Sequence, residues 1–138
     1  MTSSEVQGPD WLRLAGWSSA SAELMFLCQQ DRHALAVFAT KSRPPRYQLS
    51  VFTTVSREWQ VIHESADVNL VSQVGWTSSC VYGWGKLAHG SAQVTVEYRG
   101  VTYTVDSDPA GWWGFLHDTD PTAGDLLTPT LLDHVETD

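Results

Sequence analysis

Apolar and polar residues alternate along most of this chain, and turn-forming residues interrupt the alternation every eight to twelve positions. A period of two, with β-branched and aromatic residues enriched, is typical of strands that bury one face. Residues 47–55 give the clearest case, because every second residue from Tyr47 to Val55 shares one face. The pattern predicts strands at residues 23–28, 33–40, 47–55, 58–63, 80–84, 92–98, 101–105 and 111–117.

Three segments add to this pattern. Arg99 and Gly100 form a two-residue connection that ends in Gly, which is typical of a tight primed hairpin turn. Residues 64–75 fit a short strand and a helical turn equally well, so their structure stays open. After His117 the alternation stops, and Thr130 is placed to cap one short helical turn.

The spacing of strands and turns predicts a single all-β domain. We expect seven or eight antiparallel strands in a sandwich or a small barrel, because 138 residues suit one domain with one core. Residues 1–10 are expected to be a flexible N-terminus and residues 11–117 the β domain. Residues 118–138 form an acidic tail, either packed on the domain or free as a peptide ligand.

Charge is distributed unevenly along the chain. The net charge is −8, and residues 118–138 hold six of the acids and no Lys or Arg. Nucleic-acid binding requires a basic surface to neutralise phosphates, so we expect no nucleic-acid partner. The basic segment Lys41–Arg46 contains two prolines and is interpreted as a solvated loop, with an anion site or a dock for the acidic tail as the alternative.

The sequence shows no signal for export. The first residues lack the basic and apolar regions of a secretory signal, and no apolar run is long enough to span a membrane. We therefore expect a cytoplasmic protein without a membrane span. Cys28 and Cys80 lie in apolar segments without ligand spacing, which predicts buried, reduced thiols.

Seven tryptophans are the most unusual feature of the composition, and several follow a glycine. Neighbouring residues on a strand point to opposite faces, so one of Trp112 and Trp113 is expected to face outward. Outward aromatic residues beside small polar ones are typical of interfaces and ligand pockets. The alternative is that these indoles fill a small core. The predicted contact residues are Trp84, Trp112, Trp113, Tyr82, Tyr103 and His117.

Residues 81–117 combine Tyr82-Gly83, an alternating strand, a turn at Gly100, a second strand and the segment Gly111–Phe115. This order resembles a hairpin followed by a Gly-Trp segment in small β-sandwich domains of uncharacterised actinobacterial regulatory proteins. The resemblance implies a β-sandwich and carries over no functional residue.

Known catalytic and metal-binding motifs are missing from the sequence. The five histidines show no paired spacing, and the segment that starts at His117 lacks the ligands of a calcium loop, so no metal or cofactor is predicted. No Gly-x-Ser-x-Gly motif is present. The hydroxyls of residues 75–80 are expected to bond turn backbone rather than attack a carbonyl.

These observations favour a binding or accessory module that engages a protein partner through an aromatic patch. The alternative is a small β-barrel enzyme, similar to cyclases, that binds a hydrophobic small molecule in a pocket lined by Trp and Tyr. A closed barrel with an interior cavity would favour the enzyme, and a filled core with an exposed apolar surface would favour the module. Carbohydrate binding is a third, weaker possibility. The sequence does not determine the oligomeric state.

Overall fold

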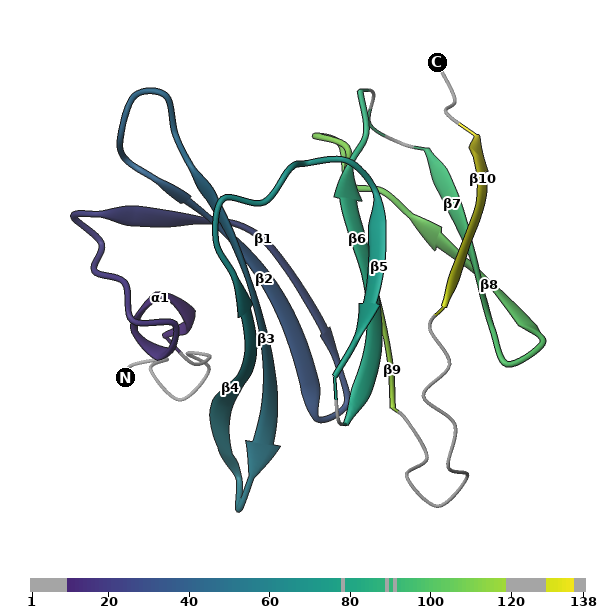
Figure 1. The fold of residues 1–138 in the computed structure, drawn as a ribbon, viewed down its shortest axis with the longest axis horizontal. Coiled ribbons are helices and arrows are strands. Elements are labelled where there is room, and N and C mark those ends of the chain that lie inside the picture. Colours follow the sequence, from purple (N-terminus) through teal and green to yellow (C-terminus); the bar gives the residue numbers. More distant parts are fainter. Residues whose placement is uncertain (1–9, 78, 89, 91, 119–128, 136–138) are drawn as a thin grey trace, which may run out of the picture.

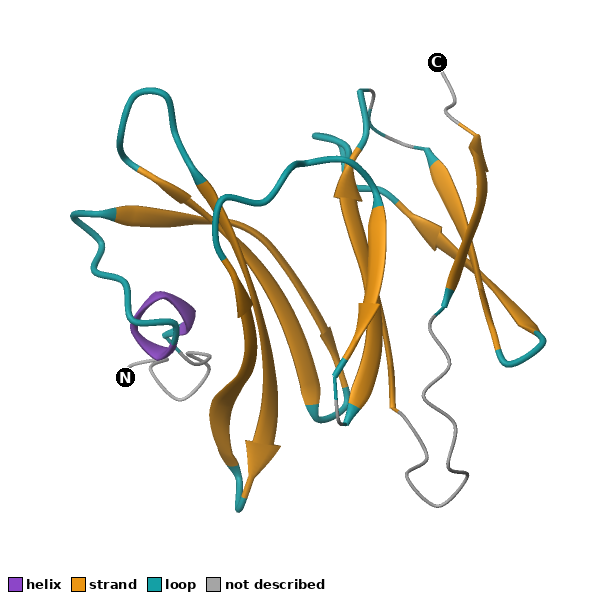
Figure 2. Cartoon of the chain, in the orientation of Figure 1, coloured by secondary structure: helices purple, strands orange, loops and turns teal. Residues whose placement is uncertain are grey.

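The computed structural model describes residues 10–77, 79–88, 90, 92–118 and 129–135 of the chain. Within this part, ten strands form three antiparallel sheets, and a single short helix, α1 (Trp11–Leu14), lies outside them. Figure 2 shows how strongly strands dominate the structure. The all-β prediction is confirmed as a sandwich-like stack, and the described sheets do not close into a barrel.

The first four strands form a meander, which we call the N-terminal sheet, in the order β1-β2-β3-β4. Each strand pairs antiparallel with the next one along the chain. Because β2 and β3 lie in the centre, they hold the most buried residues of this sheet. Their bounds are β1 (Ala22–Gln30), β2 (His33–Thr40), β3 (Tyr47–Val55) and β4 (Glu58–Ser65).

The remaining six strands form two further sheets of three strands each. The middle sheet has the order β5-β6-β9, and the C-terminal sheet has the order β10-β7-β8. The middle sheet consists of β5 (Gln73–Trp76), β6 (Cys80–Lys86) and β9 (Trp112–Asp118). The C-terminal sheet consists of β7 (Gln93–Tyr98), β8 (Val101–Asp106) and β10 (Thr130–Val135).

The three sheets are stacked face to face, with α1 on the outer face of the N-terminal sheet (Figure 1). The middle sheet is therefore covered on both sides, and every residue of β6 from Cys80 to Gly85 is buried. One face of it packs on Leu35, Val51 and their neighbours from the N-terminal sheet. The other face packs on the C-terminal sheet. The molecule thus has two apolar layers between sheets.

The described residues form ten strands, two more than the eight predicted ranges. β5 begins within residues 64–75, which the sequence left open, and ends one residue beyond them at Trp76, and β10 lies within the predicted acidic tail. The expected helical turn after Thr130 is wrong, because Thr130 and Leu131 pair with Glu97 and Val96 of β7. Leu131 also packs against the C-terminal core, and this tertiary contact decides the conformation of a short segment with little intrinsic helical stability.

The hairpin turn at Arg99 and Gly100 is confirmed, since both residues adopt positive φ, of 54° and 79°. The predicted flexible N-terminus lies, except for Asp10, outside the described residues, as do residues 119–128 and 136–138 of the predicted tail. No helix in the described part of the chain is long and apolar enough to cross a membrane.

Candidate functional site

The structure places the predicted aromatic contact residues inside the molecule. Trp84 and Trp113 are fully buried, Trp112 is 3% exposed and Tyr82 is 8% exposed. The prediction that one of Trp112 and Trp113 faces outward is wrong. The two side chains do point to opposite faces of β9, but a further sheet covers each face.

Glycines in the middle sheet make room for these large rings. In the pairing of β6 with β9, Trp84 lies opposite Gly114, and Trp113 lies opposite Gly85. A Cβ added at Gly114 would lie 2.8 Å from the Cβ of Cys28 across the layer between sheets. Gly85 and Gly114 therefore serve packing, because a residue without a side chain leaves room for an indole on the paired strand or for a neighbouring sheet at close distance.

Tyr103 and His117 are the two predicted residues that keep partial exposure. They lie together at the C-terminal sheet, with ring centroids 5.5 Å apart, and both also contact Phe115. His117 Nδ1 lies 2.8 Å from the backbone oxygen of Asp118. These contacts join β8 to β9 and contribute to packing at the end of the second apolar layer.

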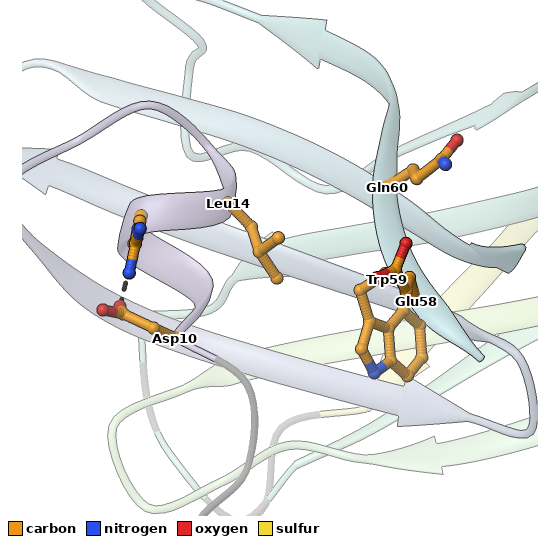
Figure 3. Close-up of a pocket in the computed structure, with 6 residues that line it drawn as sticks. Asp10, Leu14, Glu58, Trp59 and Gln60 are labelled. Atoms are coloured by element: carbon orange, nitrogen blue, oxygen red, sulfur yellow. Dashed lines mark hydrogen bonds between the residues drawn. The ribbon is translucent and has the colours of Figure 1, made fainter. Parts of the chain in front are cut away.

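A groove of about 620 Å³ opens on the other side of the molecule, between α1 and β4 (Figure 3). Leu14 reaches into it from the helix, and the Trp59 indole lies across from Leu14 on β4 (Figure 3). Its volume falls within the range of about 300–1,000 Å³ that is common for ligand sites. The lining residues are Asp10, Arg13, Leu14, Glu58, Trp59 and Gln60.

An aromatic cluster holds α1 in place beside the groove. Trp11 is buried against the N-terminal sheet, where its ring meets Phe52 and Trp59 edge to face, each at 5.0 Å. Asp10 caps the helix, since its carboxylate accepts a hydrogen bond from the backbone N–H of Arg13 at 3.3 Å. One wall of the groove is thus fixed by side-chain packing rather than by the short helix itself.

The other wall of the groove is the edge of a sheet. β4 is the last strand of the N-terminal sheet, and three consecutive β4 residues line the groove, Glu58, Trp59 and Gln60. Successive side chains on a strand point to opposite faces. The groove lining therefore includes residues from both faces of this edge strand, and among the described strands β4 pairs with β3 alone.

The sequence did not reveal this groove. The sequence analysis starts the β domain at residue 11 without predicting a helix there, and it places Trp59 on a strand. No spacing rule relates a short helix to a strand that starts at Glu58. A capping Asp10 followed by an apolar segment was a usable signal for α1.

A second group of polar residues meets where the β1–β2 and β5–β6 turns lie beside the end of β9 (Figure 1). His33 is 1% exposed, and its Nε2 lies 3.1 Å from the hydroxyl of Ser79. Its Nδ1 lies 2.7 Å from a carboxylate oxygen of Asp118, although the ring N–H is not aligned on that oxygen as a hydrogen bond. Arg32 also approaches Asp118, at 3.7 Å.

The hydroxyls of the β5–β6 turn divide into two roles. Thr77 bonds backbone as predicted, because its Oγ1 accepts from the N–H groups of Ser79 and Cys80 and donates to the Cys80 carbonyl. Ser79, in contrast, bonds the imidazole of His33. The sequence missed this group because its members are far apart along the chain and no local motif marks them.

Both cysteines are free thiols, as predicted, Cys80 buried and Cys28 half-buried. Burial raises the pKa of Cys28 from 9.0 to about 11 and also raises the pKa of Cys80. These thiols therefore stay protonated near neutral pH and are poor nucleophiles. Among the described residues, no three side chains of the metal-binding types come together.

Comparisons with family models, curated proteins and solved structures found no match to this chain. The resemblance of residues 81–117 to actinobacterial β-sandwich domains therefore stays a prediction.

Proposed function

We propose that this protein is a binding module that takes up an extended segment of a protein partner along the outer edge of β4, where no described strand pairs. The groove between α1 and β4 would receive one large apolar side chain of that segment. The observation that carries the proposal is the lining of the groove, in which Leu14 and Trp59 provide apolar surface beside the sheet edge.

The edge of β4 offers backbone groups that a peptide strand can pair with. In β-augmentation, main-chain hydrogen bonds supply affinity and pockets for alternate side chains supply specificity. The register of β4 shifts between Val61 and His63, so Glu58–Val61 is the regular stretch, and its first three residues line the groove. A bulge of this kind limits indiscriminate edge pairing and favours a short peptide over a long strand.

Charge favours a partner segment that carries a basic residue beside its apolar anchor. The carboxylates of Asp10 and Glu58 lie on the rim of the groove, against one guanidinium from Arg13. The whole chain carries a net charge of −8. This field accelerates association with a basic partner and opposes an acidic one.

The fold of the described residues does not support the alternative of a β-barrel enzyme. It depends on a closed barrel with an interior pocket lined by Trp and Tyr, and the described sheets stay open with their aromatic residues packed between layers. A cytoplasmic location and the lack of a nucleic-acid partner remain predictions from the sequence. Both agree with a module that binds another protein.

A peptide selection tests the proposal. A phage-displayed library of random peptides is selected on the full chain, and the dissociation constant of the best synthetic peptide is measured by fluorescence anisotropy. We expect Trp59→Ala and Leu14→Asp each to weaken binding at least tenfold. Leu24→Ser serves as the matched control, because Leu24 is 37% exposed on β1, the opposite edge of the same sheet.

Circular dichroism establishes that each variant keeps its fold. The Leu14 side chain is 36% exposed, so Leu14→Asp perturbs the core less than Trp59→Ala does. Peptides that bind both groove variants as tightly as the original chain, or that lose affinity with Leu24→Ser instead, would contradict the proposed site.

A further inference from the structure

We propose that Ser79 is a nucleophile that reacts with acyl and phosphonyl electrophiles, with His33 as its base and Asp118 as the positioning residue of the imidazole. This reactivity is separate from the peptide groove, which lies between α1 and the edge strand β4. Three strand ends, from β2, β6 and β9, bring the side chains together.

The atoms that face each other are those required for base activation. Nε2 of His33 lies 3.1 Å from the Ser79 hydroxyl, and Nδ1 lies 2.7 Å from Asp118 Oδ1. A carboxylate beside Nδ1 favours the tautomer with its proton on that atom, which leaves Nε2 free to accept the hydroxyl proton. Catalytic hydrogen bonds are often poorly aligned before a substrate binds, so the present ring orientation is compatible with this role.

The position of each side chain fits its role. His33 is buried, which shields its pairing with the Ser79 hydroxyl from water, while Ser79 itself is half-exposed. The neighbouring thiol of Cys80 is a poor competitor, because burial raises its pKa. Between these two described neighbours, Ser79 is therefore the favoured nucleophile.

A second serine–histidine pair in the same molecule provides an internal comparison. His63 Nε2 lies 2.9 Å from the Ser65 hydroxyl on β4. The contacts of the described residues give His63 no carboxylate at its other ring nitrogen, and its ring packs on Tyr82. If a hydrogen bond to histidine sufficed for reactivity, Ser65 and Ser79 would react alike.

The turn that holds Ser79 also limits how fast an acylated Ser79 can be hydrolysed. The N–H groups of Ser79 and Cys80 converge on the Thr77 hydroxyl oxygen, at 3.2 and 3.0 Å. They are thus engaged and do not stabilise a substrate oxyanion in this conformation. We therefore expect a stable covalent adduct that forms readily and hydrolyses slowly, rather than rapid turnover.

With p-nitrophenyl acetate as the probe, the step balances without a further reactant. The Ser79 Oγ attacks the acetyl carbonyl and forms a new C–O bond, while its proton passes to Nε2 of His33. The bond between the carbonyl carbon and the p-nitrophenyl oxygen then breaks, and p-nitrophenolate leaves as an anion. The imidazolium returns its proton to solvent, which leaves acetylated Ser79.

The test is a stopped assay of the full chain with p-nitrophenyl acetate, read by p-nitrophenolate absorbance, intact mass and peptide mapping. We expect one acetyl group per chain, located on Ser79. Ser79→Ala should abolish this adduct, whereas Ser65→Ala should leave its rate unchanged. An adduct that forms equally in Ser79→Ala, or on Ser65 as fast as on Ser79, would overturn the proposal.

Substitutions of Asp118 distinguish a positioning role in the acetylation of Ser79 from a purely structural role. Asp118 is 43% exposed in its side chain, so Asp118→Asn is expected to fold, as circular dichroism would show. We expect Asp118→Asn to lower the acetylation rate at least tenfold and Asp118→Glu to restore part of it. Folded Asp118→Asn protein that reacts at the original rate would exclude the positioning role. No acetylation of the original chain would show that the three residues only link the strand ends.

Discussion

Replacing Gly114 with Ala is expected to destabilise the protein by disturbing the contact between the N-terminal and middle sheets. The added Cβ would lie 2.8 Å from Cys28 Cβ and 2.9 Å from Phe26 Cε2, whereas ordinary contacts begin at 3.4 Å. The two sheets must therefore move apart by several tenths of an ångström, or neighbouring side chains must leave their rotamers. Overpacking of this kind typically costs about 1–3 kcal/mol.

Urea denaturation followed by tryptophan fluorescence measures this loss. Native domains are stable by only about 5–15 kcal/mol, so the expected change is well within the range of the assay. Thr104→Ala, on the exposed surface of β8, is the control and should change the free energy of unfolding by about 0.5 kcal/mol or less.

A double variant makes the prediction more specific. The Sγ atom of Cys28 would lie 3.1 Å from the new methyl group, so Cys28→Ala should relieve part of the overlap. Gly114→Ala together with Cys28→Ala is expected to cost less than the sum of the two single changes. Full stability of Gly114→Ala would refute the idea that the glycine permits close sheet packing, whereas strict additivity of the pair would show only that Cys28 Sγ adds nothing to the overlap.

Two further predictions concern buried groups. Trp84→Ala should lower the free energy of unfolding by about 3–5 kcal/mol because the indole is fully buried. Trp76 is 48% exposed, so Trp76→Ala should cost less, about 1–2 kcal/mol. Equal costs in urea denaturation would contradict this assignment. Because burial raises the pKa of Cys28 from 9.0 to about 11, the unfolded chain releases a proton in this interval that the folded chain retains, and stability should fall as pH rises through it. Denaturation at several pH values should show a smaller fall for Cys28→Ala; an identical pH dependence would exclude the thiol as its source.

The strand positions could be predicted because β-branched and aromatic residues recur with a period of two between turn-forming residues. Residues 47–55 alternate clearly, and β3 occupies this same range. β10 could not be predicted in the same way, since its pairing with β7 depends on a partner far away along the chain. A segment as short as Thr130–Val135 takes its conformation from that partner rather than from its own propensity.

The burial of Trp84, Trp112 and Trp113 agrees with the alternative that these indoles fill the core, and the sequence contained a further signal for it. The segment Cys80–Trp84 is apolar throughout instead of alternating, and a continuous apolar run is typical of a strand covered on both faces. That pattern predicts a middle layer, in which Trp84 and its neighbours have no outward face. The period of two correctly predicted that the side chains of Trp112 and Trp113 point to opposite faces of the strand. It wrongly predicted that one of these faces is exposed, because a further sheet covers each of them.

The two candidate sites were beyond local sequence reasoning for a physical reason. The groove arises where α1 docks beside β4, and Ser79 meets His33 through the stacking of two sheets. Such juxtapositions follow from tertiary packing, whereas motifs record only neighbours along the chain.

The most direct test of the binding proposal is an NMR titration of the isotope-labelled full chain with the selected peptide. We predict chemical-shift changes concentrated on Leu14 and on the β4 segment Glu58–Val61, together with NOEs between backbone protons of the peptide and of β4. This pattern would show that the peptide adds a strand at the edge of the N-terminal sheet. Changes that centre instead on β1 or on Trp76 of β5, without NOEs to β4, would contradict the account.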